Sequence, residues 1–148
     1  MAGNKSDFLE NLVVNTVIGK STDLTAAIPS TLWIALLNTT VGDVWLPTDT
    51  GEVGTTAVAD NYIRYKFTNS TVSNWTKATT GLVQNKAEFE FTASASTGWG
   101  TVRSFVIVTT SSTSAGDSLY WGDLTSPVVV SAGNVVRFST GTLLIAEL

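Results

Sequence analysis

The sequence predicts an all-β protein: an antiparallel β-sandwich of about eight strands, jelly-roll-like, with one N-terminal helix. Helical spacing of apolar residues is confined to the first 19 residues. After residue 31, short apolar or alternating segments recur, and tight Gly-bearing turns separate the later ones. This number of strands suits two four-stranded sheets packed face to face.

The composition predicts one folded domain with a neutral surface. Hydrophobic residues make up 43% of the 148 residues, whereas charged residues make up only 14%, against roughly 25% in an ordinary domain. A disordered chain would show the opposite balance. The net charge of −4 and the scattered Lys and Arg argue against a nucleic-acid partner. No apolar run is long enough to span a membrane, and no secretory signal precedes the helix, so we expect synthesis in the cytoplasm.

The N-terminal segment predicts a flexible arm over residues 1–6 and a helix that ends at Gly19. Asp7 is the expected N-cap, with Glu10 three residues later as in a capping box. The apolar side chains of the helix recur at helical spacing: Phe8, Leu9, Leu12, Val13 and Val17. We therefore expect residues 1–19 to form an arm and a docking helix, and residues 20–148 to form the β-sandwich domain.

Eight strands are expected after the helix, at 31–38, 61–68, 86–91, 101–109, 118–124, 127–131, 134–139 and 142–148. The strand at 31–38 is apolar on both faces, which predicts a central position. The strand at 101–109 is also apolar on both faces. Its expected first face carries Val102, Val106 and Val108, and its second carries Phe105 and Ile107.

Two strands alternate between apolar and charged residues. In 61–68 the side chains expected to point inward are Ile63, Tyr65 and Phe67, and those expected to point outward are Arg64 and Lys66. In 86–91 the inward side chains are Ala87, Phe89 and Phe91, and the outward ones are Lys86, Glu88 and Glu90. If the two strands were neighbours, their opposite charges would attract across the ladder.

The connection at 39–60 is longer than most structureless loops and carries an apolar tip of Val44, Trp45 and Leu46. Two interpretations remain open for it. The tip either folds back over one end of the sandwich or contacts another chain.

Few residues are suited to catalysis. The chain has no His and no Cys, which excludes His-dependent triads, thiol nucleophiles, and zinc or haem ligation by these residues. Glu88 and Glu90 have a spacing that a glycosidase could use, but two acids on a polar strand face usually serve solvation. Asp43, Asp49 and Glu52 share the long loop without the pattern of a calcium-binding loop. We expect no enzyme activity, no cofactor and no metal.

The tryptophans in or beside strands are expected to pack in the core or at its rim: Trp33, Trp75, Trp99 and Trp121. The alternative is an exposed aromatic platform for a sugar.

A series of short motifs resembles a family of small virion proteins of tailed bacteriophages. It runs over about residues 6–148 in this order: Ser6-Asp7-Phe8-Leu9-Glu10-Asn11, TLWIALL at 31–37, Asn61-Tyr62-Ile63-Arg64, Trp99-Gly100-Thr101-Val102, the strand from Leu119 to Leu124, and the turn from Val130 to Asn134. Asn61 stands where Gly is usual, and the 39–60 loop is larger than in the family pattern. Each motif is only a strand or a turn, so the order of the series carries the resemblance.

The resemblance implies a structural virion protein of the β-sandwich class. Its first implied role is a capsid cement or decoration protein, a homotrimer that binds the major capsid protein on the outside of the head and bridges capsomers. The expected interface combines helix residues Phe8, Leu9, Leu12 and Val13 with loop residues Val44, Trp45 and Leu46. We expect a chain lacking residues 1–18 to fold but not to attach to particles.

Two alternatives remain. One is a tail or tail-tip component that binds a glycan through Trp45 or another exposed aromatic residue. The other is a carbohydrate-binding module unrelated to phages.

Overall fold

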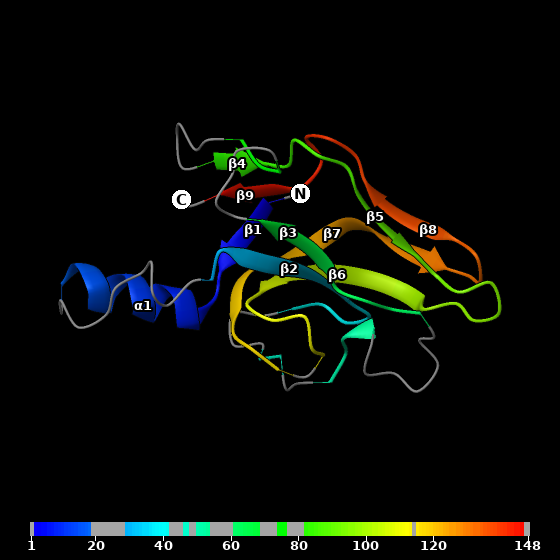
Figure 1. Cartoon of the computed structure of the whole chain (residues 1–148), viewed down its shortest axis with the longest axis horizontal. Helices are drawn as coiled ribbons and strands as arrows, with labels where there is room; N and C mark the ends of the chain where they lie inside the picture. Colours follow the sequence, from blue (N-terminus) through cyan, green and yellow to red (C-terminus); the bar gives the residue numbers. More distant parts are fainter. Residues whose placement is uncertain are drawn as a thin grey trace.

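The computed structural model describes residues 2–18, 29–41, 46–47, 50–53, 61–68, 74–76, 82–113 and 115–146. Within these residues the chain forms one helix and nine strands (Figure 1). In chain order the elements are β1 (Ala2–Lys5), α1 (Asp7–Val17), β2 (Thr31–Leu37), β3 (Tyr65–Thr68), β4 (Leu82–Gln84), β5 (Phe89–Thr92), β6 (Gly100–Val108), β7 (Ser118–Val130), β8 (Val135–Phe138) and β9 (Leu144–Ala146).

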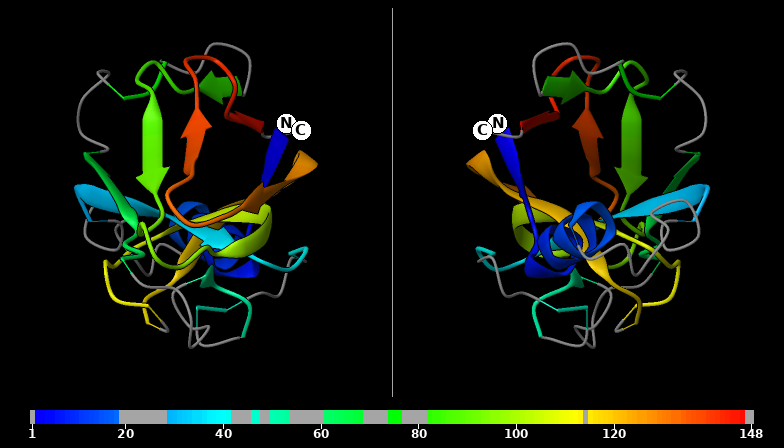
Figure 2. Two further views of the ribbon diagram at one scale, coloured as in Figure 1. Left: turned by 90° about the vertical axis from the view of Figure 1, so that its right-hand side faces the viewer. Right: turned by 90° about the vertical axis from the view of Figure 1, so that its left-hand side faces the viewer.

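The strands form two hydrogen-bonded sheets. One has the order β3-β2-β6-β7-β1-β9-β4, and the other is the ribbon β5-β8. Neighbouring strands are antiparallel except β1 and β9, the first and last strands of the described residues, which lie side by side and run parallel (Figure 2). The predicted antiparallel all-β fold with one N-terminal helix is confirmed. The expected division into two four-stranded sheets is wrong, because β1 pairs with both β7 and β9 and so joins their strands into one sheet.

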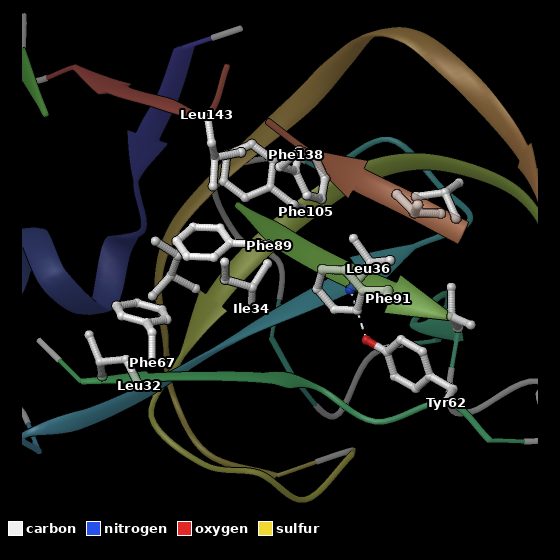
Figure 3. Packing of buried hydrophobic residues seen from close by; sticks show 14 of the residues in the cluster. Leu32, Ile34, Leu36, Tyr62, Phe67, Phe89, Phe91, Phe105, Phe138 and Leu143 are labelled. Atoms are coloured by element: carbon white, nitrogen blue, oxygen red, sulfur yellow. Dashed lines mark hydrogen bonds between the residues drawn. The ribbon is translucent and has the colours of Figure 1, made fainter. Parts of the chain in front are cut away.

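The main core lies between the β5-β8 ribbon and the larger sheet (Figure 3). Phe89 and Phe91 of β5 alternate inward, as predicted, and Phe138 comes from the neighbouring β8. The ring of Phe138 lies 6.4 Å from that of Phe105 on β6, measured between centroids. Full burial of a side chain of this size contributes about 1.5–3 kcal/mol, so this aromatic cluster stabilises the contact between the two layers.

Strand β6 is interior, between β2 and β7, and both of its faces are covered. Phe105 and Ile107 point into the main core, whereas Val106 and Val108 join a second cluster with Leu37. The two apolar faces of this strand predicted that both would be buried, and the structure confirms it. Val102 was expected on the face of Val106, but it belongs to the main core, because the register with β7 shifts between residues 102 and 104.

Residues 2–5 are a strand and not the free arm expected from the sequence. Asn4 lies opposite Trp121 of β7, and Gly3 lies opposite Ile145 of β9. Ser6, not Asp7, caps the helix: its hydroxyl accepts a hydrogen bond from the Leu9 amide at 3.4 Å. From this cap α1 runs outward, away from the sandwich (Figure 1).

The segment 61–68 enters β3 in a different phase from the predicted one. Ile63 is 78% exposed and Arg64 is buried, the reverse of the expectation, although Phe67 is buried as predicted. The strand begins only at Tyr65, and the chain turns at Asn61, which has a φ of 66°. The period of two therefore does not extend back to residue 61.

The other differences are local. Residues 118–130 form one strand through Pro127, where two were expected, and β4 was not predicted. Strand β5 pairs with β8, and not with the strand at 61–68.

Candidate functional surfaces

The helix residues of the predicted interface lie against the protein's own core. Leu9 and Leu12 are 3% and 8% exposed and belong to the main core, while Phe8 and Val13 are partly buried against it. Leu46 is exposed, and Val44 and Trp45 lie outside the described residues. An interface formed by these residues stays a prediction. The four helix side chains already have a role in holding α1 on the sandwich.

The opposite side of α1 is exposed and was not predicted as a surface. Val14 is 57% exposed and Ile18 is 78% exposed, and Asn11 is also exposed. The spacing of residues 11, 14 and 18 was the available signal in the sequence. The predicted helix interface contained only the stripe that includes Leu9 and Val13.

A polar cluster lies buried at one end of the sandwich. The carboxylate of Glu52 accepts hydrogen bonds from Arg64 Nε at 2.7 Å and Arg64 Nη2 at 2.6 Å, and both side chains are fully buried. Arg64 Nη1 donates to the carbonyl oxygens of Thr110 and Ala115. Glu52, a candidate calcium ligand in the sequence, is thus engaged by a cation of the chain itself.

Tyr62 completes this cluster. Its hydroxyl accepts a hydrogen bond from the Leu36 amide at 2.8 Å (Figure 3) and donates one to Glu52 Oε1 at 3.3 Å. Burial, together with the negative charge of Glu52, raises the pKa of Tyr62 well above its ordinary value. The phenol is therefore neutral at physiological pH and serves as a structural hydrogen-bonding group.

The two acids considered for glycoside hydrolysis form an exposed ion-pair network. Arg137 Nε lies 3.2 Å from Glu88 Oε1, and Arg137 Nη2 lies 2.6 Å from Glu90 Oε2. The hydrogen bond to Glu90 and the charges of both acids raise the pKa of Arg137. Glu88 and Glu90 are thus both engaged by a cation of the chain itself.

Two open grooves flank the β5-β8 ribbon. The first, of about 510 Å³, runs between β3 and β5 and is lined by Ile63, Lys66, Glu90 and neighbouring residues. The second, of about 490 Å³, lies between β7 and β8 and is lined by Val128, Val135 and Thr142 among others. Both are suited in size to a small ligand or a peptide segment. Neither places a tryptophan as an exposed platform, because Trp99 beside the first groove is 4% exposed.

The four strand-associated tryptophans pack as predicted. Trp99 is in the main core, Trp75 packs against that core, and Trp33 and Trp121 pack against the second cluster. In the described residues, no three His, Cys, Asp or Glu side chains lie close enough together to hold a metal ion. None of the helices in these parts of the chain has the length and hydrophobicity that crossing a bilayer requires.

Comparison with known proteins identifies the family. The profile of the family described as "Podophage GP4 fiber I protein gp80" matches residues 4–146, nearly the whole chain. No curated protein matches the chain. The family is one of virion proteins of tailed phages, in agreement with the resemblance carried by the motif series. The chain is thus a bacteriophage structural protein, associated with the virion, and it belongs to the podophage GP4 fiber I protein gp80 family.

Proposed function

We propose that this chain is a non-catalytic structural subunit of a virion fibre. The proposal rests on the family match over residues 4–146, because the description of the matching family names a fibre protein. The geometry supports a structural role. Glu52, Glu88 and Glu90 are engaged by arginines, and the strand-associated tryptophans are used in packing. The subunit acts through protein contacts, without a cofactor, nucleic acid or membrane as partner.

The capsid cement role is the second candidate, and one observation favours it. The chain has no internal repeat or stalk segment, and its strands form one two-layer sandwich (Figure 2). A unit of this kind covers a shell more readily than it extends from one. In that role it binds the major capsid protein as a homotrimer and stabilises the shell by mass action.

The location of the protein on purified virions separates the two candidates. Gold-labelled antibody raised against the purified chain is imaged by electron microscopy, and densitometry against the major capsid protein gives the copy number. Antibody against the major capsid protein marks the head in a parallel sample. Antibody pre-absorbed with the purified chain is the control for specificity.

Label on the tail or on projecting fibres, with few copies per particle, supports the fibre role. Label spread over the head, with a copy number close to that of the capsid protein, overturns the fibre role and favours the cement role. A fibre attached to the head would give discrete projecting clusters of label, which separates it from a continuous coat.

A further inference from the structure

The outer edge of β5 presents backbone groups that the described part of the chain leaves unpaired. The ribbon β5-β8 has only two strands, so each strand has one paired edge and one open edge. The Ala93 amide donates to the Asn134 carbonyl oxygen, one step along the ladder from the pair of Thr92 and Val135. Because hydrogen-bonded pairs alternate along an antiparallel ladder, the N–H and C=O groups of Glu90 and Thr92 point away from β8.

These backbone groups lie along the groove of about 510 Å³ between β3 and β5. Glu90, Phe91 and Thr92 line it from β5, and Tyr65 and Lys66 line it from β3. Strand β3 is itself the last strand of the larger sheet. In Figure 2, β3 lies on the side of the molecule toward which the open edge of β5 is directed. The groove is therefore bounded by the edges of two strands.

Strand β5 lacks the features that usually block an exposed edge. Such edges are protected by Pro, by Lys or by a bulge. The strand contains neither Pro nor Lys, and its register with β8 is regular from Phe89 to Thr92. The acids Glu88 and Glu90 are held by Arg137 of β8, on the paired side of the strand. An incoming strand could pair with the open edge without breaking the ladder between β5 and β8.

Lys66 gives the groove a positive charge on the wall opposite β5. Its side chain is exposed, and the ion pairs of the described residues do not include it. The other charged groups of the groove are already compensated: Glu90 by Arg137, and the buried Arg64 by Glu52. Charge complementarity therefore favours a ligand that places an acidic group near Lys66.

We propose that this groove binds one extended segment of a neighbouring virion protein, which adds to β5 as a third strand and places an acidic side chain against Lys66. The backbone of a strand is the ligand that matches the outward N–H and C=O groups of Glu90 and Thr92. A second folded copy of this chain would present a two-layer body with sheets about 10 Å apart, whereas a groove between two strand edges admits a single strand.

This proposal rests on the structural role in the virion proposed above, and it applies to a fibre as well as to the head. The antibody localisation does not depend on the groove. A wrong location and an unoccupied groove are therefore separate results.

Hydrogen exchange of backbone amides tests the pairing in the assembled protein. Exchange is measured by mass spectrometry with residue resolution for the free chain and for the chain in purified virions. We expect the amides of Glu90 and Thr92 to exchange rapidly in the free chain and slowly in virions. The amides of Phe89 and Phe91, which face β8, should exchange slowly in both and are the internal control. Rapid exchange at Glu90 and Thr92 in virions would overturn the proposal.

Binding of defined peptides tests the occupant. The probes are overlapping peptides of about ten residues, the length of a long strand, that cover the virion proteins of the same phage, including this chain. Thr92→Pro removes an N–H group that points out of the edge and leaves the bonds to β8 in place. Lys66→Glu reverses the charge of the opposite wall. Arg103→Glu, a charge reversal at an exposed arginine of β6 outside the groove, is the matched control.

We expect acidic peptides of another virion protein to bind the unchanged chain and Arg103→Glu equally. Thr92→Pro and Lys66→Glu should each weaken this binding by about tenfold or more, as expected for a lost hydrogen bond to a charged or buried group. Circular dichroism shows that each variant is folded. Binding that neither substitution weakens, binding only by peptides of this chain, or no binding by any peptide contradicts the proposal.

Discussion

Arg64 and Glu52 form a two-pronged ion pair enclosed at one end of the sandwich, with both side chains fully buried. The pair joins a residue of the long 39–60 connection to the segment that leads into β3. Through Arg64 Nη1 it also holds the carbonyl oxygens of Thr110 and Ala115, on the connection between β6 and β7. One side chain therefore fixes three separate parts of the chain to one another.

Removal of Arg64 leaves the Glu52 carboxylate buried without a counter-charge. We expect Arg64→Leu to lower the free energy of unfolding by about 3–5 kcal/mol, the usual cost of breaking a buried pair from one side. The double variant Glu52→Leu/Arg64→Leu is expected to be more stable than Arg64→Leu, because it buries no lone charge. Urea denaturation followed by tryptophan fluorescence measures both. If the double variant lost as much free energy of unfolding as the two single variants added together, the lone charge would not be the cause.

Arg137→Leu is the matched control for that series. Arg137 is an exposed arginine that also pairs with acids, Glu88 and Glu90, but water screens the attraction. We expect its urea midpoint to match that of the unchanged chain. A large loss for Arg137→Leu would indicate that any arginine replacement, buried or not, destabilises this fold.

The raised pKa of Tyr62 predicts that the folded protein loses stability at alkaline pH. Its folded-state pKa is raised above 10.0, the ordinary value, so the folded protein holds this proton more tightly than the unfolded chain. The contribution of this protonated phenol to the free energy of unfolding is complete below pH 10. It declines as the pH rises from there toward the folded-state pKa of Tyr62. Urea midpoints measured from neutral to strongly alkaline pH check this. Tyr62→Phe should flatten the decline, and an unchanged decline would assign it to other groups.

The same substitution has an effect at neutral pH. Tyr62→Phe removes the acceptor of the Leu36 amide and a donor to Glu52. An unsatisfied buried group costs about 1–3 kcal/mol, and we expect a loss of stability in this range at pH 7. Tyr65→Phe, at a half-buried tyrosine of the following strand, is the control and should cost less. Equal losses would remove the hydrogen bonds of Tyr62 as the explanation.

Asn85 joins the β4–β5 connection to the β8–β9 connection through its fully buried side chain. Its Nδ2 donates to the carbonyl oxygens of Ala87 and Ser139 at 2.8 and 2.9 Å, and its Oδ1 accepts from the Leu143 amide at 2.9 Å. We expect Asn85→Asp to destabilise the protein at pH 7 more than Asn85→Ala, because a carboxylate there faces carbonyl oxygens instead of donating to them. Thermal unfolding measures both variants. The order should reverse or vanish at low pH, where the acid is protonated; persistence of the full difference there would exclude charge as the cause.

The position of β1 changes the expectation for a truncated chain. Removal of residues 1–18 takes away the strand that joins β7 to β9 and the core side chains Leu9 and Leu12. We therefore expect this truncation to unfold or aggregate rather than leave a folded sandwich. A chain whose Val14 and Ile18 are both changed to Ser keeps β1 and the core and is expected to fold. Circular dichroism distinguishes the outcomes, and a cooperative unfolding transition in the truncated chain would contradict this expectation.

The sequence by itself determined the fold class and the character of its regular strands. Phe89 and Phe91 alternate with the charged residues Glu88 and Glu90. Because this alternation is regular along β5, the inward face of the strand could be predicted. The apolar faces of β2 and β6 likewise predicted interior strands. The motif series predicted the phage virion family that the family match shows.

Only the tertiary structure decided the features that depend on partners distant in the chain. Arg64 is buried because Glu52 neutralises it, and residues 2–5 are a strand because the open edges of β7 and β9 accept their backbone. The local sequence indicates neither feature. An arginine and the segment Ala-Gly-Asn-Lys are both typical of solvent-exposed positions. The helix shows the same division: its spacing predicted an apolar face, but the packing of Leu9 and Leu12 on the core decided which face remained outside. Local periodicity reflects the chain's own geometry, whereas burial depends on what the rest of the molecule brings against it.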